Sequence, residues 1–108
     1  MVLKEMRLKM VGMKFQKPSK VPQWNDAVTL VHEKDNPHDP NAVAILNQAN
    51  ERIGYVGTTK TVSRGNRKNG CIDNQQLLHE MDLDNDEYVA FISKARDGFG
   101  FINVVVGE

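Results

Sequence analysis

The polar loop of residues 33–41 holds the side chains of this sequence that are best suited to chemistry. It carries a carboxylate, an imidazole and two amides, at Asp39, His38, Asn36 and Asn41. Two prolines limit the freedom of the loop, so these groups are held nearly fixed and little ordering entropy opposes the binding of a ligand. The alternative is purely structural, because Asn and Asp side chains often accept hydrogen bonds from nearby backbone amides as Asx-turns. On the residues alone, we favour the structural interpretation.

Catalysis and metal binding are poorly supported by the same residues. His38 and Asp39 could serve a small hydrolase, but neighbours in an extended loop point in different directions, and no Ser or Cys nucleophile lies beside them. The three histidines lack the spacing of metal ligands, and one cysteine, Cys71, cannot build a structural zinc site. The acidic segment 82–87 lacks the length, the sharp-turn glycine and the distal glutamate of a calcium loop. We therefore expect no enzyme, no metal and no cofactor.

Charge is segregated along the chain, although 14 basic and 14 acidic residues give a formal net charge of zero. Residues 1–20 hold six Lys and Arg against one acid, and residues 52–70 hold five and no acid. The acids gather in residues 25–51 and 71–87. A neutral chain can thus fold with a basic face that attracts an anion, since the local field steers a ligand. The alternative is a surface on which the charged blocks cancel as salt bridges.

The elements that must position these groups are mainly strands. Residues 6–10 alternate apolar and basic side chains, which is strand periodicity, and Asp97-Gly98 is typical of a hairpin turn. The expected strands are 6–11, 27–33, 42–46, 53–56, 88–95 and 99–106. Six short strands in 108 residues favour a small OB-like or SH3-like barrel, because closure removes exposed strand edges. We expect one domain over residues 1–108.

One or two short helices should cover an end of this barrel. Asp73 followed by Gln76 resembles a capping box and predicts a helix carrying Ile72, Leu77, Leu78 and Met81. A helical turn is expected near residues 59–64, followed by a loop to Gly70. We expect Trp24 to cover the core as a lid and Cys71 to lie in the core. The longest apolar run has five residues and no signal-peptide pattern opens the chain, so a cytoplasmic location is expected.

Three segments together resemble the HIRAN domain family. Glu33-Lys34-Asp35-Asn36-Pro37-His38-Asp39-Pro40-Asn41-Ala42-Val43 resembles the family signature. Val11-Gly12-Met13-Lys14-Phe15 resembles its opening glycine-basic-aromatic segment, and Ile53-Gly54-Tyr55-Val56 resembles its Ile-Gly-Tyr-Val strand. The match covers roughly residues 8–60 and has the features of a small, stand-alone member of prokaryotic type. It implies an OB-like six-stranded barrel with two helices that binds single-stranded DNA, at a 3′-hydroxyl end in the best-known members.

The resemblance also implies roles for individual residues. Lys14 occupies the position that contacts phosphate, Phe15 the position that stacks on a base, and Asp39 the carboxylate that accepts from the terminal 3′-hydroxyl. His38 stands where the family usually has Tyr and can still stack or donate. Either Phe99 or Phe101 would supply the aromatic that opens the last strand. Tyr55 in the Ile-Gly-Tyr-Val strand, with Lys60 and Arg64 as phosphate contacts, completes the expected nucleic-acid-binding set.

Two departures from the family pattern bear on this interface. Gln16 stands where a second aromatic often occurs, and Gly57-Thr58 replaces a usual basic pair. The leading hypothesis remains a non-enzymatic module that binds 3′ ends of single-stranded DNA in replication or repair, with a helicase or nuclease acting in trans. The alternative is a protein-interaction adaptor that uses the same groove for an acidic or terminal peptide. Basic blocks beside Phe15 would favour nucleic acid, whereas basic blocks paired with acids would favour the adaptor.

Overall fold

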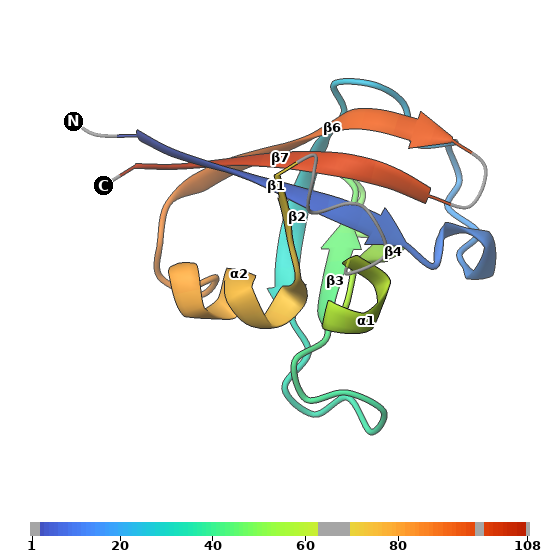
Figure 1. Cartoon of the computed structure of the whole chain (residues 1–108). Coiled ribbons are helices and arrows are strands. Elements are labelled where there is room, and N and C mark those ends of the chain that lie inside the picture. The colour runs from blue at the N-terminus through green and yellow to red at the C-terminus, as the bar shows by residue number, and fades with distance from the viewer. Residues whose placement is uncertain (1–2, 63–69, 97–98, 108) are drawn as a thin grey trace.

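Six antiparallel strands close into a barrel in the computed structural model, which describes residues 3–62, 70–96 and 99–107 (Figure 1). The strands are β1 (Leu3–Val11), β2 (Ala27–His32), β3 (Val43–Leu46), β4 (Arg52–Val56), β6 (Tyr88–Arg96) and β7 (Phe99–Gly107). They follow the order β4-β3-β2-β6-β7-β1. Besides its pairing with β7, β1 also pairs with β4, at the other end of this order, with Met10 opposite Val56 and Val11 opposite Tyr55. This second pairing closes the barrel and confirms the predicted mainly β fold.

The interior of the barrel is filled by the inward-facing side chains of its strands. In β1, Met6, Leu8 and Met10 are buried while their neighbours face outward, and Val28 and Leu30 do the same in β2. The core cluster is completed from the other strands, by residues Val43, Ile45, Ile53, Val56, Ala90, Ile92, Ile102, Val104 and Val106. The inward positions of β1 and β2 therefore follow period-two alternation, whereas β3 is buried at consecutive residues and the core residues of β4, Ile53 and Val56, are three positions apart.

Gly54 lets β4 approach β1 closely enough to close the barrel. A Cβ added at Gly54 would lie 2.7 Å from Met10 Cγ and 2.9 Å from the Val11 carbonyl oxygen. Contacts this short are not tolerated by real Cβ atoms, so the position requires glycine. The glycine of the Ile-Gly-Tyr-Val strand is thus explained by the closure of the barrel.

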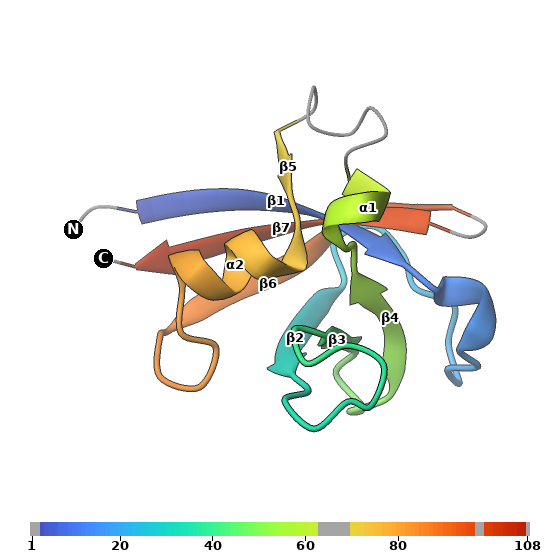
Figure 2. The ribbon, with the colours of Figure 1, turned by 60° about the horizontal axis from the view of Figure 1, so that its bottom comes forward.

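Short elements between the strands complete the fold. They are the 3₁₀ turn η1 (Met13–Phe15), α1 (Thr59–Val62), the two-residue strand β5 (Cys71–Ile72) and α2 (Asn74–Glu80). The Asp73 carboxylate accepts from the Gln76 amide at 2.8 Å, which confirms the predicted helix cap. α2 places Leu77 in the main core. Ile72, expected on this helix, instead lies in β5, which pairs in parallel with β1 (Figure 2).

Two large side chains differ from expectation. Trp24 is 74% exposed, so its predicted role as a lid on the core is wrong. Phe101 is 7% exposed and packs with Val62 and Cys71 in a second, small apolar cluster outside the barrel. Cys71 is buried there, as predicted. Within the described ranges, no helix is long and apolar enough to cross a membrane.

Candidate nucleic-acid interface

The loop of residues 33–41 is ordered by its own polar side chains. The Asn36 Oδ1 atom accepts from the backbone amides of His38 at 2.9 Å and Asp39 at 3.1 Å. The Asp39 Oδ1 atom accepts from the amide of Asn41 at 2.8 Å. The predicted Asx-turns are therefore present, and they hold the exposed His38 and the half-buried Asp39 in a rigid backbone frame.

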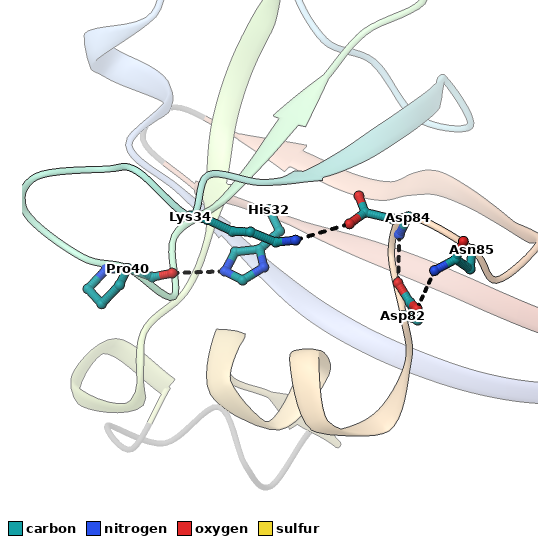
Figure 3. Close-up of polar contacts among 6 residues, drawn as sticks. All are labelled: His32, Lys34, Pro40, Asp82, Asp84 and Asn85. Atoms are coloured by element: carbon teal, nitrogen blue, oxygen red, sulfur yellow. Dashed lines mark hydrogen bonds and ion pairs between the residues drawn. The ribbon is translucent and has the colours of Figure 1, made fainter.

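Contacts from outside the turn fix the two ends of the loop (Figure 3). The His32 Nε2 atom donates to the Pro40 carbonyl oxygen at 2.8 Å, which joins the last residue of β2 to the returning chain. Lys34 Nζ lies 3.3 Å from Asp84 Oδ2 and ties the loop to the segment between α2 and β6. Asp82 orders that segment by accepting from the Asp84 amide at 3.0 Å. Asp82 and Asp84 thus support the loop from one side.

A buried amide, Asn74, holds the Asp39 carboxylate from the other side. Asn74 is 2% exposed, and its Nδ2 atom donates to Asp39 Oδ2 at 3.1 Å and to the Asn41 carbonyl oxygen at 2.9 Å. The Asn74 backbone amide donates to the Gly57 carbonyl oxygen at 2.9 Å. The start of α2 therefore connects Asp39 to the end of β4. Sequence reasoning missed Asn74, because a polar residue in a first helical turn usually signals no more than a helix start.

Glu33 and Tyr55 connect the loop to the barrel wall. The Tyr55 hydroxyl donates to Glu33 Oε1 at 3.0 Å, Asn36 Nδ2 donates to the same oxygen at 3.1 Å, and Arg52 pairs with Oε2 at 2.6 Å. Burial raises the pKa of Glu33, but these hydrogen bonds and the Arg52 charge outweigh it, so the pKa lies below its ordinary value. Burial and the same hydrogen bond to Glu33 raise the pKa of Tyr55. Glu33 is therefore an ionised anchor of the loop.

The η1 turn follows β1 and presents an exposed aromatic ring. Gly12 adopts φ 74°, a left-handed conformation that ends the strand, and the Phe15 amide donates to the Gly12 carbonyl oxygen at 3.1 Å. Phe15 is 76% exposed, and the Lys14 ammonium lies 5.2 Å from the centre of its ring. A Cβ built on Gly12 would be 3.9 Å from the Tyr55 ring, so Tyr55 lies between η1 and the loop.

The remaining predicted site residues are Phe99, Phe101, Lys60 and Arg64. Phe99 is half-buried at the η1 end of β1, because the next residue of β7, Gly100, pairs with Met10. Phe101 is 7% exposed and is covered by the small cluster around Val62, so of the two phenylalanines Phe99 offers a base the more accessible ring. Lys60 is exposed on α1, and Arg64 lies outside the described residues.

The HIRAN domain family profile matches residues 3–72. This chain belongs to the HIRAN domain family. A search of curated proteins found no significant match to the sequence of this chain. The segments that carry the resemblance, at residues 11–15, 33–43 and 53–56, all fall inside the matched part of this HIRAN domain.

Solved structures give the same fold for this HIRAN domain. The crystal structure of the HIRAN domain of human HLTF matches with a TM-score of 0.69 and 16% identity, over 94% of this chain and 74% of that one. A protein from Lactobacillus plantarum matches with a TM-score of 0.59 and 10% identity, over 98% and 100% of the two chains. At such low identities the likeness establishes the fold alone, a barrel with two short helices.

Proposed function

We propose that this HIRAN domain is a non-enzymatic module that binds single-stranded DNA at its 3′ end, in replication or repair. One observation carries the proposal. An exposed aromatic ring with a lysine beside it, Phe15 with Lys14, and a rigid loop that holds a carboxylate, Asp39, both adjoin β4. Tyr55 of β4 lies beside Gly12 at the start of η1 and donates to Glu33 at the start of the loop, so one side chain links the two elements.

Phe15 and Lys14 supply affinity in this proposal. The ammonium occupies one face of the ring, which leaves the other face for a base. Stacking of a base on an aromatic side chain contributes about 1–3 kcal/mol and is tolerant of sequence. The same ammonium is placed to meet the phosphate that follows the stacked base. Affinity should therefore fall with salt, as expected for contacts to a nucleic-acid backbone.

Asp39 supplies the selection of a chain end. An ionised carboxylate has about four positions at which it can accept a hydrogen bond. Two are used, by the Asn41 amide and the Asn74 side chain. The others can accept from a terminal 3′-hydroxyl, whereas a phosphate at the same place would be repelled by the negative charge. The hydrogen bonds from Asn41 and Asn74 orient the carboxylate and leave it able to accept a further hydrogen bond from the 3′-hydroxyl.

The distribution of basic residues bears on the adaptor alternative. Lys4 pairs with Glu80, Arg52 with Glu33 and Lys34 with Asp84, so part of the basic surface is neutralised. Lys14 lies beside Phe15 and has no acidic partner among the described residues. The cation nearest to the exposed ring is thus available to an anion, which favours nucleic acid over an adaptor.

The proposal is tested by fluorescence anisotropy with oligonucleotides that end in a 3′-hydroxyl, a 3′-phosphate or a closed hairpin. The 3′-hydroxyl oligonucleotide should bind most tightly. Asp39→Asn should remove most of this preference, and Asp35→Asn, an exposed carboxylate of the same loop, should keep it. Equal binding of all three ends would refute end recognition. No binding at about 50 mM salt would refute the nucleic-acid proposal and favour the adaptor.

A further inference from the structure

A basic groove adjoins η1 and shares no lining residue with the loop of residues 33–41. It has a volume of about 550 Å³ and lies between the segment that follows β1 and the last residues of β6. Its walls include Lys14, Lys17, Arg96, Met13, Val21 and Pro22. Figures 1 and 2 both place η1 and the end of β6 at the same end of the molecule. The groove is defined here by these six residues.

We infer that this groove holds the single strand on the 5′ side of the terminal nucleotides. The inference rests on the proposed function and extends it from an end-binding site to a path for the strand. Lys14 belongs to both places, because it contacts the Phe15 ring and also lines the groove. A strand that ends at Asp39 and stacks on Phe15 enters the groove as it continues in the 5′ direction.

Charge in the groove matches the backbone of a nucleic acid. Its three basic side chains are Lys14, Lys17 and Arg96, and no acidic side chain lines it within the described residues. Elsewhere on the surface, bases such as Lys34 and Arg52 are paired with acids. A cluster of three positive charges attracts a chain of phosphates and repels other cations.

The apolar wall of the groove suits a nucleic acid better than it suits an isolated anion. Val21 is 77% exposed, and Met13 and Pro22 are half-buried beside it. Deoxyribose rings and base faces can cover this surface while the phosphates meet the cations. Because no aromatic ring among the described residues lines the groove, we expect contacts there to be set by phosphate and to show little dependence on sequence.

The experiment compares thymidine oligonucleotides of three and nine residues, each with a free 3′-hydroxyl, by anisotropy between 50 and 200 mM salt. Each phosphate contact on a single strand contributes a slope of about −0.7 in log K against log salt. Lys17→Gln and Arg96→Gln together should reduce the slope for the nine-residue strand by about 1.4. Over this salt range the wild type should then lose about sevenfold more affinity than the double variant.

The controls separate this inference from the proposed function. Binding of the three-residue strand should be unchanged in the double variant, because that strand reaches only the terminal site. Lys20→Gln removes an exposed charge from the same segment but outside the groove, and should leave both strands unaffected. Equal slopes of log K against log salt for the wild type and the double variant on the nine-residue strand would overturn the inference. That result would leave the proposed 3′-end site unaffected. Equal weakening of both strands would also overturn the inference, and failure of the wild type to bind either would overturn the proposed function itself.

Discussion

Truncation of Phe15 to alanine should weaken binding of single-stranded DNA without unfolding the protein. Burial of a whole Phe side chain stabilises by about 1.5–3 kcal/mol, and Phe15 is 76% exposed, so its packing contributes only about 0.4–0.7 kcal/mol. The exposed contact with Lys14 adds about 0.5–1 kcal/mol. The fold therefore survives, since small domains are stable by about 5–15 kcal/mol. Loss of a stacked base costs about 1–3 kcal/mol, which raises Kd by about 5- to 150-fold.

Anisotropy with a labelled 3′-hydroxyl oligonucleotide measures this loss, and thermal unfolding checks the fold of the variant. Trp24→Ala is the matched control, because Trp24 is an aromatic side chain of nearly equal exposure, 74%, in a different part of the same inter-strand segment. The control should bind like the wild type. The reasoning is refuted if Phe15→Ala binds within about twofold of the wild type. It is also refuted if Trp24→Ala weakens binding as much as Phe15→Ala does.

Three further changes test the supports of the site. Asn74→Ala should lower stability by about 1–3 kcal/mol in urea unfolding, because it removes a buried amide that donates to the half-buried Asp39 carboxylate and Asn41 carbonyl, and should reduce the preference for a 3′-hydroxyl over a 3′-phosphate. The pKa of Glu33 is lowered on folding, so its stabilisation is present above the ordinary pKa of 4.5 and is lost as pH falls through the folded value. Glu33→Gln should accordingly flatten the acid dependence of the unfolding free energy, measured between about pH 3 and 6. Gly54→Ala places a methyl group 2.7 Å from Met10 Cγ and should lower the melting temperature through overpacking of about 1–3 kcal/mol; an unchanged melting temperature would contradict the account of barrel closure.

Elements with local periodicity could be predicted from the sequence. The alternation of Met6, Leu8 and Met10 identifies the inward face of β1, and the spacing of Asp73 and Gln76 identifies the start of α2. These signals are local, because each depends on the period of one strand or on one helix cap. The Asx-turns of the loop could also be predicted from the sequence, since Asn36 accepts from amides only two and three residues away.

Long-range contacts could not be predicted in this way. Asn74 holds Asp39 across 35 residues of sequence, and no period or motif links the two positions. Phe101 alternates as an outward-facing residue of β7, but Val62 of α1 and Cys71 of β5 cover it. β5 has two residues, too few to show a period. Burial on the outside of the barrel thus depends on the segment between β4 and α2, where the sequence pattern is weak.

Amide chemical-shift mapping by NMR tests the central claim most directly, because it reports where a single strand binds. A six-residue oligonucleotide with a free 3′-hydroxyl should shift amides of residues 12–17, 38–41 and 55–58, with the 3′-phosphate form losing the shifts at residues 38–41. Shifts confined to the acidic segment 82–87 or to the start of β6, or no shifts at all, would contradict the proposed interface.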